Sequence, residues 1–184
     1  ILGCDVGEAG FRQHIGFLPE NPYFYPFLTG REILRFYARL CGVESSLLAE
    51  RVNDLLALVR LEHASDARLS TYSKGMLQRV GIAQALIHDP EVAFLDEPMS
   101  GLDPIGRKDI RDIILRLKAA GKTVFMNTHI LSDVEMICDR VAIIVNGRIR
   151  YEGPIREFLR EDELRSDIVL ARLPSETSTE LGER

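Results

Sequence analysis

The sequence is short of cysteine, of positive charge and of long apolar runs, and each shortage excludes a class of protein. The three cysteines are odd in number and form no C-x-x-C pair, so we expect no disulfide framework and a reducing, cytoplasmic setting. The net charge of −5 argues against nonspecific nucleic-acid binding, which needs a basic surface. No apolar run approaches the roughly 18–20 residues of a membrane span. With no signal peptide visible, we expect a soluble protein that can still dock on a membrane partner.

The remaining composition suits one folded core. The chain has 184 residues, of which 46% are hydrophobic, enough for one domain or for one domain with an insertion. It begins at Ile1 and not at Met, so we expect a piece of a longer protein or a processed form.

The first half of the chain is predicted to be mostly helical. Short strands are expected over residues 1–6 and 15–18. Thr29-Gly30-Arg31-Glu32 has the S/T-x-x-E pattern of a capping box and precedes a periodic apolar run. Two more helices are expected over about 48–59 and 74–88, and no strand is visible within residues 30–88.

The second half alternates strands and helices. The expected elements are a strand ending at Asp96, a helix opened by Asp103-Pro104 and stopped at Gly121, a strand over 123–126, a helix capped by Ser132-x-x-Glu135, a strand over 141–145 and a hairpin at Asn146-Gly147. This alternation predicts an α/β fold with a parallel sheet core. The helices of about residues 21–88 then form an inserted side lobe.

Two adjacent carboxylates, Asp96 and Glu97, end the apolar run Val92–Leu95 and are followed by Pro98. The run reads as a buried strand, and burying two carboxylates at its end is costly unless they bind a cation or a reacting group. The carboxyl edge of a parallel sheet is also where α/β proteins bind ligands. These carboxylates are therefore the first candidates for a metal-assisted reaction; the alternative is a solvated strand end with a proline stop.

Five short segments occur in a characteristic order along the chain. They are Ile15-Gly16-Phe17-Leu18-Pro19-Glu20, Tyr72-Ser73-Lys74-Gly75-Met76-Leu77-Gln78-Arg79, Leu95-Asp96-Glu97-Pro98, Ser100-Gly101-Leu102-Asp103-Pro104 and Asn127-Thr128-His129. Their order and spacing resemble the nucleotide-binding subunit of an ATP-binding cassette (ABC) transporter. The resemblance covers about residues 1–158. It implies a P-loop NTPase-like core, with ATP and Mg²⁺ as cofactors.

The resemblance gives Ser73 and Gly75 the role of the signature sequence, which is usually Leu-Ser-Gly-Gly-Gln. Tyr72, Lys74 and Met76 depart from it. A serine with the backbone N–H groups of a helix start makes a natural cradle for a γ-phosphate. The alternative is a plain serine N-cap with a glycine in the first turn.

The resemblance also assigns the carboxylates and one histidine. Asp96 matches the Walker B aspartate that holds Mg²⁺ through water, and Glu97 matches the catalytic carboxylate that polarises the attacking water. His129 matches the switch histidine that contacts the γ-phosphate, whereas the other histidines match no motif and are expected at the surface. Asp103 lies in the segment that resembles the D-loop, which reaches across a dimer, and it also suits a helix N-cap. Glu20 stands where the family usually has Gln; as an oxygen ligand it can bind Mg²⁺.

One family motif is missing from these residues. The phosphate loop G-x-x-x-x-G-K-[ST] has only a false match at Gly121-Lys122-Thr123, because its first glycine position is Arg116 and the triplet follows a helix instead of a strand. We expect the true loop upstream of Ile1, which makes residues 1–160 an N-terminally truncated ABC ATPase domain. Residues 161–184 are expected to be a tail or the start of an accessory domain.

The leading hypothesis is the ATPase subunit of an exporter of the ABC-2 type. Its implied partners are a membrane permease and a second ABC subunit bound head to tail, with no nucleic acid; its implied place is cytoplasmic, peripheral on the inner face of the membrane. Without the phosphate loop, the piece itself is expected to be inactive. The alternatives are a soluble ABC protein acting on DNA or ribosomes, and a non-catalytic remnant that only binds a partner.

Overall fold

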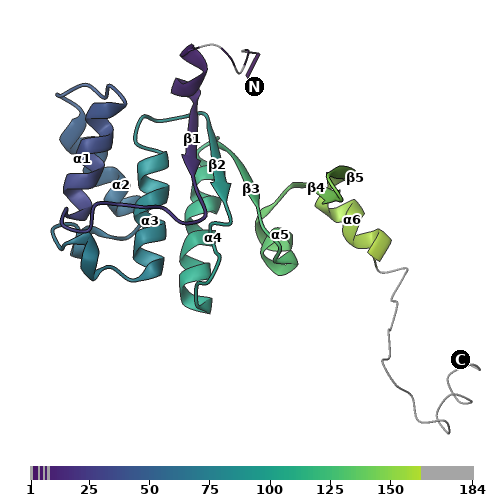
Figure 1. Cartoon of the computed structure of the whole chain (residues 1–184). Coiled ribbons are helices and arrows are strands. Elements are labelled where there is room, and N and C mark those ends of the chain that lie inside the picture. Colours follow the sequence, from purple (N-terminus) through teal and green to yellow (C-terminus); the bar gives the residue numbers. More distant parts are fainter. Residues whose placement is uncertain (1, 4, 6, 8, 163–184) are drawn as a thin grey trace, which may run out of the picture. The chain divides into compact units, whose positions relative to one another are not determined.

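The computed structural model describes residues 2, 3, 5, 7 and 9–162 and divides the chain into two compact units, one up to Ile137 and one from Cys138. A parallel sheet lies at the centre of the first unit (Figure 1). Its strands are β1 (Ile15–Leu18), β2 (Val92–Asp96) and β3 (Thr123–Asn127), in that spatial order. The α/β fold with a parallel core is therefore confirmed.

The strand register aligns the three carboxyl ends. Leu18 pairs with Leu95, which pairs with Met126, so the residues after all three strands emerge at one edge. On one face of the sheet a row of rings, Phe17, Phe94 and Phe125, crosses the strands in register. Phe17 and Phe125 are 56% and 61% exposed. This face is therefore apolar and open.

The inserted lobe consists of α1 (Gly30–Leu40), α2 (Leu48–Leu58) and α3 (Lys74–Ala85), with 3₁₀ turns at Glu62–Ala64 and Leu69–Thr71. The capping box forms as predicted, because Thr29 accepts from the Glu32 N–H and Glu32 accepts from the Thr29 N–H. The three helices pack against one another and α3 also packs on β1. Gly16 permits that contact, since a Cβ there would collide with the Ala85 carbonyl.

Helix α4 (Pro104–Ala119) packs against β3 and contacts α5 (Leu131–Ile137). Asp103 caps α4 through the Gly106 N–H, and Gly121 follows the helix with a φ of +79°, both as predicted. The predicted cap at Ser132 is wrong. Thr128 accepts from the Ile130 N–H and the Ile130 carbonyl accepts the first helical bonds, so the helix already includes Ser132.

The second unit contains β4 (Arg140–Val145), β5 (Arg148–Pro154) and α6 (Ile155–Asp162). The tight turn at Asn146-Gly147 has φ values of +51° and +71° and joins β4 to β5 in an antiparallel pair. The expectation that the strand over 141–145 belongs to the parallel core is therefore wrong within the described residues. The hairpin supplies β4 with a local partner, and β4 is not part of the three-stranded sheet.

Two smaller expectations also fail. The strand expected over residues 1–6 is not found at Leu2 and Gly3, which form a turn, and a 3₁₀ helix, Ala9–His14, precedes β1. His88 was expected on the surface with His14 and His63, but its ring is half-buried and bonds the Ile15 carbonyl at 2.9 Å. Residues 163–184, nearly all of the predicted tail, lie outside the described part. Among the described residues, no helix has both the length and the apolar character of a membrane span.

Candidate functional site

The carboxyl edge of the sheet brings Asp96 and Asn127 together. These residues are register partners at the ends of β2 and β3. The Asn127 side chain donates to Asp96 Oδ1 at 2.8 Å and accepts from the Glu97 N–H at 3.1 Å. The second Asp96 oxygen has no hydrogen bond among the described residues. Asn127 therefore orients both acidic residues while leaving one carboxylate oxygen for another ligand.

Glu97 lies directly beyond β2 in the left-handed region, with a φ of +44°. This conformation is uncommon for a residue with a long side chain. Its Oε1 lies 2.9 Å from His129 Nδ1, whereas Oε2 is buried and has no hydrogen-bond partner in the described structure. The side chain is 20% exposed and that of His129 is 74% exposed. The pair thus joins an exposed imidazole to an acid with one unused oxygen.

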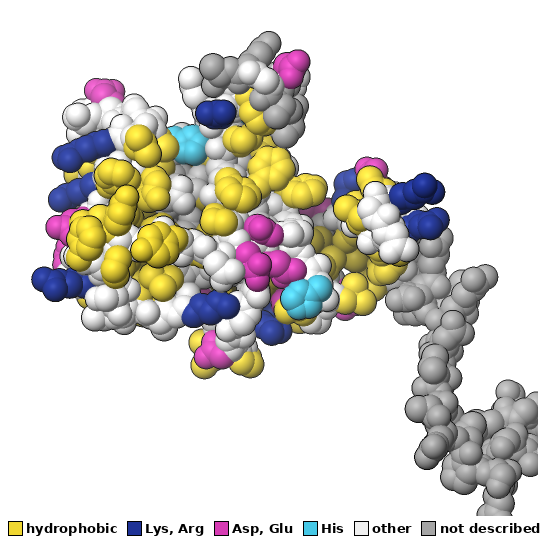
Figure 2. All heavy atoms as spheres, viewed as in Figure 1, with side chains coloured by type: hydrophobic (Ala, Val, Ile, Leu, Met, Phe, Trp, Pro, Cys, Tyr) yellow, Lys and Arg dark blue, Asp and Glu magenta, His cyan; other side chains and the backbone are white. Residues whose placement is uncertain are grey.

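The unpartnered Oε2 of Glu97 shows whether the residues at this edge fit a bound metal. A buried carboxylate oxygen without a partner costs free energy, so it suits a water, a cation or a reacting proton. Oxygen donors from Asp96 and Glu97 are the ligands that Mg²⁺ prefers. The residues at this edge therefore fit the metal that the sequence implies, and Figure 2 shows acidic side chains gathered beside a histidine on one face of the molecule.

Glu20, the second predicted metal ligand, lies at the same edge but apart from these contacts. It follows β1 by two residues and its side chain is exposed. Among the residues described, no three acidic, histidine or cysteine side chains converge as a metal-binding group. A contribution of Glu20 would thus be one oxygen among ligands supplied by water or by a nucleotide.

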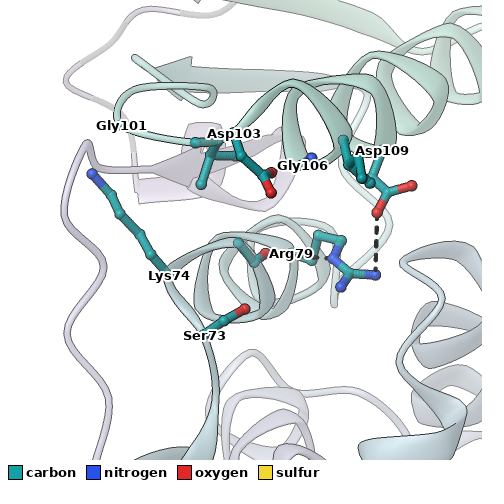
Figure 3. A pocket seen from close by; sticks show the side chains of 10 residues that line it. Ser73, Lys74, Arg79, Gly101, Asp103, Gly106 and Asp109 are labelled. Atoms are coloured by element: carbon teal, nitrogen blue, oxygen red, sulfur yellow. Dashed lines mark hydrogen bonds and ion pairs between the residues drawn. The ribbon is translucent and has the colours of Figure 1, made fainter.

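A second group of predicted residues lines a hollow of about 310 Å³ between α3 and α4 (Figure 3). We call it the Ser73 pocket, and its lining consists of Ser73, Lys74, Gly75, Arg79, Gly101, Leu102, Asp103, Ile105, Gly106 and Asp109. Ser73 caps α3 by accepting from the Met76 N–H at 3.2 Å. Ser73 and Asp103 are both exposed helix caps on opposite walls, so each predicted residue has a structural role that leaves it accessible.

Tyr72 explains one departure from the usual signature. Its hydroxyl donates to the Ala64 carbonyl at 2.6 Å inside the lobe, and Gly30 gives it room. Burial, assisted by the charge of Asp66, raises the pKa of Tyr72, so the hydroxyl stays protonated as a donor. A leucine could not make this bond. The tyrosine therefore anchors the turn that presents Ser73.

The false phosphate-loop match is occupied by other interactions. Lys122 Nζ donates to Asp89 Oδ1 at 2.8 Å and to the carbonyls of Asp89 and Pro90 at 3.2 and 2.9 Å. Arg51 of α2 reaches the same Asp89 oxygen at 3.0 Å. Lys122 thus ties the start of β3 to the end of the lobe, at the edge opposite the carboxylates.

The structure therefore places the predicted residues in two groups, Asp96, Glu97 and His129 at the sheet edge and Ser73, Gly75 and Asp103 around the pocket. In the described part of the chain, Glu20 makes no hydrogen bond or ion pair to either group. Sequence reasoning gave no role to Asn127, Arg79 or Asp109. The register of β2 with β3 is the signal for Asn127, because it follows from aligning the two strand ends. Arg79 and Asp109 carry no such signal.

Comparisons with known proteins agree on one family. A family model described as "ABC transporter" matches residues 5–100. An uncharacterized ABC transporter ATP-binding protein of Nostoc sp. is 53% identical over 161 residues, which cover 86% of this chain and 48% of that protein. A fluoroquinolones export ATP-binding protein of Mycobacterium tuberculosis is 46% identical over 76% of this chain and 45% of its own length.

A solved structure described as an ATP binding subunit of an ABC transporter is similar in fold. Its TM-score is 0.76 at 32% identity, over 91% of this chain and 70% of that one. The chain spans about half the length of the curated relatives that it matches.

Proposed function

The chain belongs to the ABC transporter family, and from this premise we propose that it is part of an ATP-hydrolysing subunit that powers export through a separate membrane permease. The observation that carries the proposal is the Glu97–His129 pair at the end of β2, with its one buried, unpartnered oxygen. The mycobacterial relative is named as an export protein, and this supports export as the direction of transport. The subunit would act in the cytoplasm, peripheral on the inner face of the membrane.

The residues at the carboxyl edge of the sheet would carry out the hydrolytic step. Glu97 accepts a hydrogen bond from the attacking water with its free oxygen and polarises it. His129 Nδ1 lies 2.9 Å from the other Glu97 oxygen and would hold the carboxylate in one orientation, while the exposed imidazole would contact the γ-phosphate. Asp96, with Glu20, would hold Mg²⁺, which supplies charge neutralisation when bound.

The Ser73 pocket would complete a second site. Ser73 and Gly75 carry the N-terminal N–H groups of a 12-residue helix, which favour a phosphate group. Since no described contact joins Ser73 to Glu97, we propose that Ser73, Gly75 and Asp103 act on the nucleotide of a second ABC subunit, arranged head to tail. ATP would then be bound between two subunits, and its hydrolysis would allow the two subunits to separate.

The lobe offers a surface for the permease. Exposed aromatic and aliphatic side chains gather on α1 and on the loop before it, and Figure 2 shows a yellow patch over this part of the chain. They are Tyr23, Tyr25, Phe27, Phe36 and Leu40, from 45% to 84% exposed. Patches of this kind mark protein interaction sites. We propose that this patch of the lobe, within residues 21–88 of the 1–160 ATPase domain, meets a cytoplasmic helix of the permease.

A form of the protein that contains a phosphate loop provides the test. We expect steady phosphate release from ATP that requires Mg²⁺ and increases when the permease is present in the same vesicles. Tight ATP binding with no release under either condition would contradict the proposal. It would favour the alternative of a non-catalytic cassette that only binds a partner.

A further inference from the structure

Four charged side chains join the lobe to helix α4, and two of them, Arg79 and Asp109, line the Ser73 pocket. Arg60, which follows α2, donates to Asp109 at 3.0 Å and to Asp112 at 3.2 Å. Arg79 of α3 lies 3.9 Å from the second Asp109 oxygen. We call Arg60, Arg79, Asp109 and Asp112 the lobe–α4 cluster. Its two positive and two negative charges balance, so it requires no ligand of its own.

Arg79 connects the cluster to the signature turn. Its side chain is 14% exposed and its Nε donates to the Gly75 carbonyl at 3.4 Å, one turn back along α3. Its Nη1 donates to the carbonyls of Val59 and Arg60 at 3.1 and 3.2 Å. One side chain therefore links the first turn of α3 to the end of α2 and faces Asp109 (Figure 3).

Arg60 is held in an unusual conformation for this contact. Its φ of +56° is in the left-handed region, which is uncommon for a residue other than glycine. The same residue offers its carbonyl to Arg79 and its guanidinium to α4. Backbone strain of this kind persists only where the surroundings hold it.

Asp109 is the member that both arginines share. It lies on the second turn of α4, the helix that Asp103 caps. Elsewhere across the pocket, a Cβ at Gly75 would meet Leu102 at 3.8 Å, and the Lys74 ammonium lies beside Gly101 without a hydrogen bond among the described residues. The ion pairs of Asp109 with Arg60 and Arg79 are therefore specific polar contacts that join α4 to the lobe.

We propose that Asp109 is a positioning residue for the Ser73 pocket. Acting through Arg79 and Arg60, it sets how Ser73 and Asp103 are presented together to the neighbouring subunit. Asp109 lies on a different element from Glu97. Its effect on ATP use rests on the proposed function, whereas its effect on the pocket walls does not.

The first experiment uses the 184-residue chain and measures amide hydrogen exchange. We expect Asp109→Asn to speed exchange about three- to tenfold at the N–H groups of Met76, Leu77 and Gly106, on both walls of the pocket. Asp112→Asn is the matched control, because it removes an Arg60 contact from the same helix but none from Arg79. If faster exchange is confined to α4, or if both variants behave alike, the positioning role is refuted.

The second experiment uses a form with a phosphate loop and separates KM from kcat. We expect Asp109→Asn to raise the KM for Mg-ATP about three- to tenfold, with kcat within about twofold of the parent. Arg79→Gln should produce the same change and add little to it in the double variant, because both act through one contact. Additive effects, or a lowered kcat at unchanged KM, would overturn the inference. If the parent protein with its phosphate loop has no ATPase activity, the proposed function is refuted. The hydrogen-exchange experiment then decides whether Asp109 is a positioning residue.

Discussion

Glu97 combines a strained backbone with an incompletely bonded side chain. A non-glycine residue in the left-handed region costs on the order of 1–3 kcal/mol. In return, its N–H reaches Asn127 and its carboxylate reaches His129. Backbone strain and an oxygen without a hydrogen-bond partner on one residue are features expected of a reacting group. Substitutions at Glu97 and at Asp96 should therefore affect ATP hydrolysis and ATP binding differently.

Glu97→Gln should abolish hydrolysis and preserve ATP binding in a form that carries a phosphate loop. Glutamine keeps the shape and a hydrogen bond but loses the carboxylate that polarises water, a loss worth about 10²–10⁴ in rate. ATP should then stay trapped between two subunits, so gel filtration with Mg-ATP should show a stable dimer. Near-normal phosphate release by this variant would mean that Glu97 is not the catalytic carboxylate.

Asp96→Asn should fail in a different way. The amide removes the charge that would hold Mg²⁺, so we expect weaker Mg²⁺-dependent ATP binding and not a trapped dimer. Equilibrium ATP binding with and without Mg²⁺ measures this. If Asp96→Asn and Glu97→Gln show the same binding and the same dimer, the two roles are not separable.

Asp89 makes a prediction about pH. Burial opposes its ionisation, but the hydrogen bond from Lys122 and the charges of Arg51 and Lys122 outweigh it and lower the pKa of Asp89. A lowered pKa in the folded state adds stability above the ordinary value of about 3.9, and this is lost as pH falls through the lowered value.

The free energy of unfolding of Asp89→Asn, measured in urea at several pH values, therefore tests the interaction of Asp89 with Lys122 and Arg51. Asparagine tolerates the φ of +60°, so the backbone is preserved. We expect a loss of at most about 1 kcal/mol above pH 5, since the site is largely exposed, shrinking toward pH 3. Asp54→Asn is the control, an exposed acid without an ion pair in the described structure. A difference that is flat with pH would contradict the assignment.

At the scale of elements, local signals predicted helices better than they predicted pairing. Caps at Thr29, Ser73 and Asp103 appear in the sequence because each acts on residues three positions away. Ser132 misled because Thr128 begins the turn earlier. The strand over 141–145 and its hairpin at Asn146-Gly147 were predicted correctly. The expected addition of this strand to the parallel core was wrong, because pairing between distant strands depends on what the sheet leaves available.

The capping box of α1 can be tested alone. Thr29→Ala should lower the free energy of unfolding by about 1 kcal/mol, because the Glu32 N–H loses its acceptor. Ser70→Ala, an exposed serine with no side-chain hydrogen bond in the described residues, should change it by less than about 0.5 kcal/mol. Equal losses in both variants would show that the cap contributes nothing.

At the scale of the whole molecule, the site was predictable where motifs are contiguous and unpredictable where it depends on packing. Asp96, Glu97 and His129 follow strands whose ends must coincide, so their proximity was foreseeable. The contacts of Asp109 with Arg60 and Arg79 span 49 and 30 positions of sequence and come from different elements. No periodicity or spacing reveals such a meeting.

Residues 1–184 alone should bind ATP weakly and show no appreciable turnover, because they contain no phosphate loop whose amides and lysine would hold the phosphates. Isothermal titration with Mg-ATP and a phosphate-release assay measure the two quantities. Micromolar affinity or steady release from this chain would contradict the expectation.

The register of the central sheet has a consequence for the order of folding. Ile15 pairs with Val92, 77 positions later, whereas the lobe between them is built largely from helices that form locally. Contacts between distant residues slow folding, since the loop must close before they form. During synthesis at about 5–20 residues per second, β1 would wait roughly 4–15 s for β2 to emerge. In that interval the folding lobe shortens the separation between the two strands, so the insertion acts as a folding aid for the sheet that it interrupts.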